Sequence, residues 1–305
     1  MNVTEKHAYS LSDVIDIVLK INPESGNILC FRGESKDYGA TALQPSIYHN
    51  IGHLRNEHKI YHEIQRFNEL QFKDDDTTYA RLLRIQHHMT LTRLLDVSED
   101  IMNALYFALE ENKEKTMNRR ILYVLEIEEQ KIKYYDSDAV SVVANLACSP
   151  LKNETNPPKS KETLWRDAKN YVKRGKYGIK EFNQTESVKY LLHDIKAEKS
   201  YFEPVVVPEH IFSVFYVKPK YSFERIRGQK GAALLFGLNY QNYEKCISLL
   251  DGSQPQNWSP VTNITKIYLE GNITLADIEK LGINKAYIYP DMQNVGEYLK
   301  QKYSD

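Results

Sequence analysis

The sequence predicts an α+β protein with a mixed sheet core flanked by helices, and three observations lead to that class. Several segments repeat apolar residues at the spacing of an amphipathic helix. Shorter runs such as "NILCF" and "RILYVLEIE" have the apolar or alternating pattern of strands. A hydrophobic content of 42% and a charged content of 27% are those of an ordinary globular protein with a buried core.

The elements of the N-terminal half follow from capping residues and periodicity. Apolar residues from Val14 to Ile21 recur at helical spacing behind two serines that are good helix caps. Acidic or amide residues after Ser98 fit the first turn of another helix. We therefore expect, in order, a helix capped by Ser10 or Ser12, a strand at 27–31, a helix over 54–73, a helix capped by Thr77 or Thr78, a helix capped by Ser98 and a strand at 120–128.

The C-terminal half begins with the best linker candidate in the chain. Residues 149–163 contain two adjacent prolines and many polar residues without an apolar period. We expect a single domain over 1–305, with a helical insertion at 149–200. Beyond this segment the expected elements are helices near 163–173 and 186–199, strands at 212–218, 232–237 and 265–270, a helix ending at Gly282 and a final helix from Asp291.

Charge and cysteine content argue against several classes of protein. Forty basic and 41 acidic residues nearly cancel, so any site for a polyanion must be local. The cysteines Cys30, Cys148 and Cys246 lie far apart without a CxxC spacing, which argues against a zinc knuckle or a disulfide framework. We find no apolar run of membrane-spanning length and no signal-peptide pattern, and expect a cytoplasmic protein with no membrane contact.

The densest cluster of chemically active side chains lies at 85–98. His87, Thr92, Arg93, Asp96 and Ser98 combine an imidazole, two hydroxyls, a fixed cation and a carboxylate. We expect these residues to converge on one cleft with Arg32, which follows a strand. The alternative is a buried ion pair between Arg93 and Asp96, with Thr92 and Ser98 serving as helix caps.

An ordered set of motifs resembles the FRG-domain family, named for its Phe-Arg-Gly triplet. These motifs are "FRGES", "LQPSIY", "QHHMTLTRLLDVSEDIMNALYFA", "RIRGQKGAALLF" and "INKAYIYPDMQNVGEYL". The family usually reads His-Tyr-Gly-x-Pro-Thr-Arg-Leu-Leu-Asp-Trp, and this chain keeps the His, Thr, Arg and Asp. It departs at His88, Met89, Leu91 and Val97, which changes the expected backbone shape of the loop more than its polar groups.

A second similarity, to arginine-type ADP-ribosyltransferases of bacterial toxin and anti-phage systems, suggests a reaction and an ADP-ribosyltransferase-like sheet. Arg32 matches the aromatic-Arg-Gly strand end, Ser98 the Ser-Thr-Ser strand and Gln229 the late Glu or Gln. The resemblance implies catalytic roles for these three residues and NAD as a substrate. The expected NAD-binding residues are Arg32, Gly33, His87, Thr92, Arg93 and Asp96, with no metal.

The chemistry of NAD cleavage agrees with these residue types. Loss of nicotinamide develops positive charge on the ribose, and the protein must hold the pyrophosphate, which an arginine fork does well. Gly33 is expected to let the backbone approach the ligand. A tyrosine face can wedge the nicotinamide, and Gln229 and Ser98 can orient the ribose hydroxyls.

The resemblance to defence proteins implies a toxin or effector that modifies a nucleic acid, with RNA as the first candidate, and is neutralised by an antitoxin protein. A non-catalytic nucleotide- or nucleic-acid-binding module is the alternative, and a metal-dependent nuclease is the third reading. Weaker signals are the His58–His62 pair, the acidic run 74–76 and the basic segment at 172–180. Tyr177 lies within this basic segment and Tyr171 directly before it, a pattern that resembles base-stacking surfaces.

Overall fold

The computed structural model describes residues 1–89, 91–110, 119–152, 160–238, 248–250, 258–271 and 273–304. Its strands are β1 (Asn2–Ala8), β2 (Ile28–Glu34), β3 (Leu94–Ser98), β4 (Arg120–Ile127), β5 (Ile132–Tyr134), β6 (Val214–Lys218), β7 (Gly231–Phe236) and β8 (Val261–Leu269). Its α-helices are α1 (Leu11–Leu19), α2 (Ile51–Arg55), α3 (Glu57–Phe67), α4 (Thr78–Met89), α5 (Ile101–Leu109), α6 (Asp138–Ala144), α7 (Lys161–Val172), α8 (Gly175–Phe182), α9 (Glu186–Glu198), α10 (Glu224–Gly228), α11 (Leu275–Glu279), α12 (Lys285–Ile288) and α13 (Met292–Lys302).

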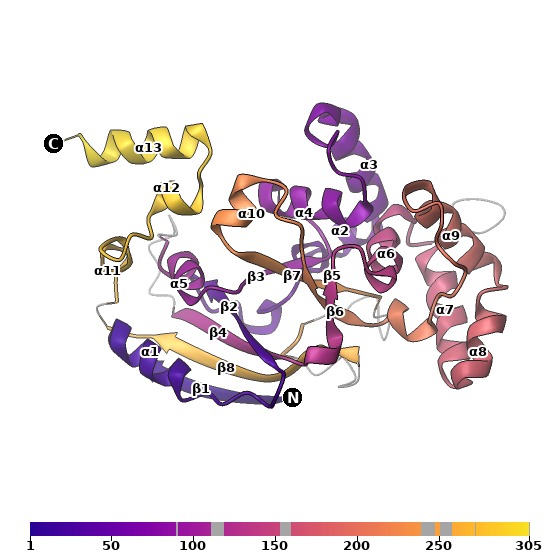
Figure 1. The fold of residues 1–305 in the computed structure, drawn as a ribbon, viewed down its shortest axis with the longest axis horizontal. Helices are drawn as coiled ribbons and strands as arrows, with labels where there is room; N and C mark the ends of the chain where they lie inside the picture. The colour runs from indigo at the N-terminus through magenta and orange to yellow at the C-terminus, as the bar shows by residue number, and fades with distance from the viewer. Residues whose placement is uncertain are drawn as a thin grey trace.

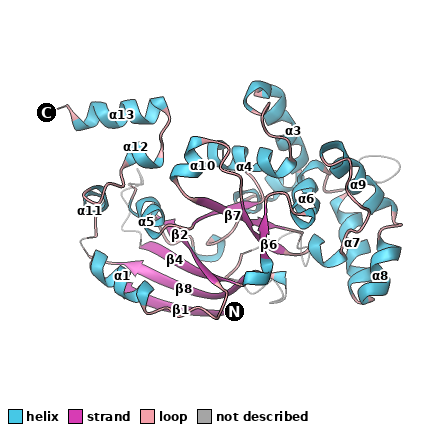
Figure 2. Ribbon diagram, viewed as in Figure 1, coloured by secondary structure: helices cyan, strands magenta, loops and turns pink. Residues whose placement is uncertain are grey.

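The eight strands form one mixed sheet in the order β1-β8-β4-β2-β3-β7-β6-β5. The outermost pairs, β1 with β8 and β5 with β6, are parallel, and the pairs between them are antiparallel. Figure 2 shows the helices above and beside the strands, with β8 and β1 along the lower edge of the molecule. The predicted α+β class, with a mixed sheet flanked by helices, is confirmed.

Two separate groups of helices cover one face of the sheet. Side chains of β2 and β4, such as Phe31 and Leu122, pack against α5, while Leu94 and Leu235 pack in a second cluster with α4, α6 and α9. Phe31 lies directly opposite Ser98 in the ladder, so both clusters belong to the same face. The boundary between the two groups therefore falls at β2 and β3, near the middle of the sheet (Figure 1).

Local signals in the sequence located some helix ends correctly. Ser10 caps α1 in a capping box with Asp13, and Asp291 caps α13. The helix expected over 54–73 is instead divided, because α2 ends at Arg55 and α3 ends at Phe67. Ser98 ends β3 rather than starting α5, whose cap is Asp100.

Strand β1 was not predicted, because its sequence, "NVTEKHA", shows little of the apolar alternation that is typical of strands. Six of its seven residues are exposed, and only Ala8 is buried. The strand is held by its parallel ladder to β8 at the edge of the sheet. Main-chain pairing at the edge of a sheet can thus form a strand that the side-chain pattern does not indicate.

The described part of the segment 149–200 contains three helices, α7, α8 and α9, which lie together at one end of the molecule (Figure 1). Helix α8 was not among the expected elements. Residues 153–159 of the expected linker, like Cys246, lie outside the described residues. In the described part of the chain, no helix is both long and apolar enough to span a membrane.

Candidate functional site

The sheet opens between β2 and β3. Only Phe31 and Ser98 are paired across these two strands, whereas β2 pairs with β4 from Ile28 to Glu34. Next to this single pair, Arg32 Nη1 donates a hydrogen bond to the main-chain oxygen of Asp96 at 2.8 Å. The arginine side chain thus joins the two strands where their own ladder stops.

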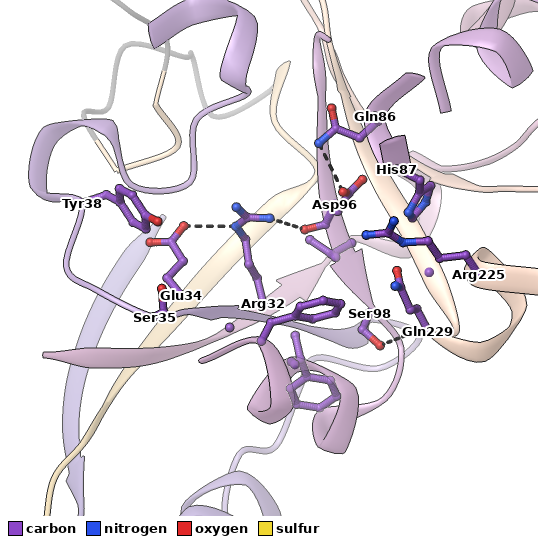
Figure 3. Close-up of a pocket in the computed structure, with 16 residues that line it drawn as sticks. Arg32, Glu34, Ser35, Tyr38, Gln86, His87, Asp96, Ser98, Arg225 and Gln229 are labelled. Carbon is purple, nitrogen blue, oxygen red and sulfur yellow. Dashed lines mark hydrogen bonds and ion pairs between the residues drawn. The ribbon is translucent and has the colours of Figure 1, made fainter. Parts of the chain in front are cut away.

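A cavity of about 270 Å³ lies at this opening, between the two helical groups (Figure 3). Its walls come from segments far apart in the sequence, namely β2, the C-terminal part of α4, β3, α5 and α10. The polar side chains that line it are Arg32, Glu34, Ser35, Tyr38, Gln86, His87, Asp96, Ser98, Arg225 and Gln229. Six of the eight predicted site residues, namely Arg32, Gly33, His87, Asp96, Ser98 and Gln229, therefore line one pocket.

Arg32 is held in place but keeps donors for a ligand. Its Nε donates to Glu34 Oε1 at 3.1 Å and its Nη1 to Asp96, and the side chain is 26% exposed. A guanidinium has five N–H donors, and these bonds use two of them. The remaining donors suit an anionic group such as a phosphate.

Asp96 and His87 meet on another wall of the pocket. Gln86 Nε2 donates to Asp96 Oδ2 at 3.2 Å, and the ring of His87 packs edge-on against Phe223. His87 is 5% exposed, and burial is the main reason that its pKa lies below the ordinary value. The imidazole is therefore neutral at pH 7, with Asp96 opposing this shift only in part.

Four buried polar atoms around the pocket have no hydrogen-bond partner among the described residues. They are Glu34 Oε2, His87 Nε2, Asp96 Oδ1 and Arg225 Nε. Buried polar atoms are normally paired, because leaving one unpaired costs about 1–3 kcal/mol. Their concentration around a single cavity indicates a site built for a polar ligand.

Ser98 and Gln229 line the pocket, yet both are engaged in local structure. Ser98 Oγ donates to the main-chain oxygen of Gln229 at 2.8 Å and accepts from the Asp100 N–H at 3.0 Å. Gln229 Nε2 donates to the main-chain oxygen of Ile288 at 3.1 Å. Gln229 follows α10 as its C-terminal cap, two residues before β7, rather than standing at the start of the strand.

Gly33 has a different reason to be glycine from the one expected. A Cβ at this position would lie 1.8 Å from the main-chain oxygen of Ala104 and 2.6 Å from the nitrogen of Ala108. Both atoms belong to the backbone of α5. The missing side chain lets helix α5 pack directly on β2, and the close approach is to this helix rather than to a ligand.

Thr92 and Arg93 do not line the pocket, which corrects the expectation that the whole 87–96 cluster converges there. Arg93 is fully buried and donates to Glu57 through Nε at 2.8 Å and Nη2 at 2.5 Å. The alternative pairing of Arg93 with Asp96 is wrong as well. Thr92 Oγ1 donates to Gln86 Oε1 at 2.5 Å, so Thr92 contacts a residue of the pocket wall without lining the pocket itself.

Sequence reasoning missed several polar residues of the pocket, above all Glu34, Tyr38, Gln86 and Arg225. Glu34 and Gln86 each stand one or two residues from a predicted site residue, and strand or helix geometry brings them to the same space. Arg225 precedes Gln229 by four residues, the spacing of neighbours on one helix face. This spacing was the available signal for Arg225.

The weaker metal-like signals have structural explanations or remain unsupported. Asp75 of the acidic run is buried and binds Arg84, with 2.5 Å between Oδ2 and Nε. His62 lies at the rim of another cavity, beside Tyr61 and Arg81. Within the described residues, no group of three histidine, cysteine, aspartate or glutamate side chains is placed to hold a metal ion.

Comparison with known proteins adds one finding to this fold and pocket. The model of the FRG domain family matches residues 27–117, which include the Phe-Arg-Gly triplet and the 87–96 motif. The match confirms the resemblance to this family over that part of the chain. No curated protein and no solved structure matches the chain.

Proposed function

We propose that the protein is an NAD-dependent ADP-ribosyltransferase whose active site is the pocket at the sheet opening. The observation that carries the proposal is the position of Arg32, Ser98 and Gln229. These residues come from three distant segments, match the transferase pattern and line one cavity. If Gln229 lay on the opposite side of the sheet from Arg32, it could not belong to this site.

The residues of the pocket fit part of a dinucleotide. Arg32 and Arg225 supply guanidinium groups for a pyrophosphate, and the unpartnered Arg225 Nε is a ready donor. Phe107 and Tyr38 supply aromatic faces for a flat ring. The volume of about 270 Å³ lies near the lower end of the roughly 300–1,000 Å³ typical of ligand sites. The enclosed part therefore suits the nicotinamide riboside end of NAD, with the remainder in the open mouth.

The pocket also suits the charge changes of the reaction. Glycosidic cleavage develops positive charge on the ribose, so groups that stabilise this charge accelerate the step. Glu34 and Asp96 place carboxylates in the same cavity as the two arginines. Anionic and cationic parts of the substrate would thus both find complementary groups.

We infer further that the acceptor is a nucleic acid, with RNA as the first candidate, in a cytoplasmic toxin or anti-phage setting with a neutralising antitoxin. Residues 168–180 contain five lysines and arginines and no acidic residue. Tyr177 in this segment is 90% exposed, which suits stacking on a base. The defence setting and the antitoxin rest on the family resemblance alone.

The decisive experiment is incubation of the purified protein with labelled NAD and, separately, total cellular RNA, DNA and protein. Transfer of label to one fraction is the expected result. Arg32→Ala should abolish transfer while the chain still unfolds cooperatively, and Arg32→Lys should restore little, because an ammonium lacks the planar fork. The matched control is Arg66→Ala, which removes an exposed arginine whose ion pair is with Glu63 on its own helix. Full activity of Arg32→Ala would remove the proposed clamp.

A second candidate function is favoured by the local bonds of Ser98 and Gln229. Because Ser98 Oγ and one N–H of the Gln229 amide already bind main-chain oxygens, the pocket can serve a module that binds a nucleotide without catalysing its reaction. Calorimetry with NAD distinguishes the two. Tight binding with no release of nicotinamide would favour the binding module.

A further inference from the structure

The pocket holds two carboxylates, and only one of them is neutralised by a cation. Glu34 Oε1 accepts from Arg32 Nε at 3.1 Å as an ion pair. Asp96 makes no ion pair with any described residue, and its carboxylate accepts only the neutral amide of Gln86 at 3.2 Å. Its Oδ1 is buried without a partner. Asp96 is therefore the uncompensated negative charge of the cavity.

The residues expected to perform catalysis are less available than Asp96. Ser98 Oγ has a donor and an acceptor partner already, and Gln229 Nε2 holds the carbonyl of Ile288. An amide, moreover, cannot take a proton at neutral pH, whereas a carboxylate can. Gln229, which matches the late Glu or Gln of the transferase pattern, therefore cannot act as a base.

We propose that Asp96 is the catalytic carboxylate of this pocket, an assignment that rests on the proposed transferase function. In the step it serves, the bond between ribose C1′ and the nicotinamide nitrogen breaks, and its electron pair leaves with neutral nicotinamide. An oxygen or nitrogen of the acceptor forms the new bond to C1′. The proton of that acceptor atom passes to Asp96 Oδ1 and from there to water.

Neighbouring residues hold this carboxylate in one orientation. Thr92 Oγ1 donates to Gln86 Oε1 at 2.5 Å and accepts from the Leu94 N–H at 3.1 Å, so the Gln86 amide can point only its nitrogen at Asp96. On the main chain, the Asp96 carbonyl accepts from Arg32. These contacts leave Oδ1 as the free end of the carboxylate, as catalysis requires of a preorganised group.

His87 borders the same space without neutralising Asp96. Its Nε2 is buried without a partner among the described residues, and burial lowers the pKa of its ring. A neutral imidazole leaves the charge of the carboxylate intact. Thr92 and His87 were both predicted to bind NAD. In the proposed site Thr92 positions Gln86, and His87 forms an uncharged part of the pocket wall.

The test compares Asp96→Asn with Glu34→Gln, which removes the same charge from the same cavity. The measured quantity is the rate of nicotinamide release from saturating NAD, with KM and melting temperature for each variant. Asparagine can still accept the Gln86 amide, so the fold should persist. We expect kcat of Asp96→Asn to fall by about 10²- to 10⁴-fold, the usual contribution of a general base. Glu34→Gln should act mainly on KM, and Gln229→Ala should cost about tenfold or less.

Chemical rescue keeps the test valid if a variant is less stable. Asp96→Ala leaves space for a small carboxylate, and its rate should recover in proportion to added formate, whereas Glu34→Ala should not respond. A purely structural role of Asp96 predicts no rescue in either variant.

The outcomes separate the assignment from the function on which it rests. If the native chain is active and Asp96→Asn stays within about threefold of it, against the 10²-fold expected of a base, the assignment is overturned and the function stands. Equal losses of kcat in Asp96→Asn and Glu34→Gln also overturn it, because net charge would then explain both. If the native chain releases no nicotinamide with any acceptor, the proposed function and the assignment fall together.

Discussion

Two groups of buried charges both take a residue from the 87–96 motif, and they differ in how completely their polar atoms are paired. The pocket contains Asp96 and three neighbours with polar atoms left unpartnered. The second group, the Glu57 cluster, consists of Glu57, Arg93 and Lys161, and none of its polar atoms is among the unpartnered ones. Unpaired atoms next to a cavity indicate ligand binding, whereas complete pairing in a closed interior indicates structural support.

The Glu57 cluster joins three parts of the chain. Glu57 opens α3, Arg93 immediately precedes β3, and Lys161 opens α7 of the helical segment. Both cations donate to the same carboxylate, and Arg93 Nη1 also donates to the main-chain oxygen of Phe236 at 3.0 Å. The cluster thus ties helix α7 to the strand that carries Asp96 at the pocket.

The local chain path explains why one motif supplies both groups. Asp96 is the third residue of β3, whereas Arg93 lies in a bend directly before the strand begins. From this bend Arg93 reaches Glu57 in the closed cluster, while Asp96 lines the pocket. Their separation in the sequence suggested a pair, but the two side chains have different partners.

The largest expected effect comes from breaking the Glu57 cluster with Glu57→Gln. This change leaves Arg93 and Lys161 as buried cations without a counter-charge, which typically costs 3–5 kcal/mol. The two cations also lower the pKa of Glu57 to about 2, so the stability it adds above pH 4.5 is lost as the pH falls toward 2, and the variant should lack this component. Urea unfolding measures both effects.

Glu63→Gln provides the control for that experiment. Glu63 pairs with Arg66 at the surface, where an ion pair contributes about 0–1 kcal/mol. If Glu57→Gln were as mild as Glu63→Gln, the cluster would not support the fold and the contrast with the pocket would fail.

A smaller effect is expected from Gly33→Ala, at the floor of the pocket. The added Cβ would meet the main chain of α5 at 1.8 Å, and overpacking of this kind typically costs about 1–3 kcal/mol. Because α5 must shift, pocket residues Ala104 and Phe107 should move with it, and ligand binding should weaken together with stability. An alanine variant with native melting and native binding would contradict the observed packing. Gly296→Ala is the control, since a Cβ there has open space around it.

The sequence predicted the class of fold and the pocket better than the roles of its residues. Capping boxes and apolar periods are local, so Ser10 and Asp291 could be placed from the sequence. The partner of Arg93 could not, because Glu57 is 36 residues away and nothing local links the two. Gly33 was likewise assigned to a ligand, since contact with a helix 70 residues later leaves no mark in the sequence.

A still smaller loss is expected from Ser98→Ala, which compares a residue of the pocket wall with the reacting groups. The variant loses the hydrogen bond to the Gln229 carbonyl and the support of the Asp100 N–H, and one such bond is worth about 0.5–1.5 kcal/mol. If Ser98 only joins β3 to α10, the free energy of unfolding should fall by about the value of one to two such bonds while nicotinamide release changes little. Loss of turnover at native stability would return Ser98 to the catalytic group.

The smallest expected effect at neutral pH belongs to Lys161→Met, which sharpens the account of the Glu57 cluster. Methionine replaces most of the buried lysine stem, and the bidentate bond between Glu57 and Arg93 remains, so the change should cost about 1 kcal/mol or less, or even stabilise the fold. Burial outweighs the attraction of Glu57 and lowers the pKa of Lys161 to about 8 from 10.5. Between these values the unfolded chain binds more protons than the folded one, so the free energy of unfolding of the native chain should rise with pH. Lys161→Met should lose this rise, and comparing the two chains by urea unfolding on either side of pH 8 cancels the titration of their common groups. Parallel pH profiles of the two chains would show that Lys161 stays charged within the cluster. Other interactions of the fold would then have to offset the energetic cost of placing two cations on one carboxylate.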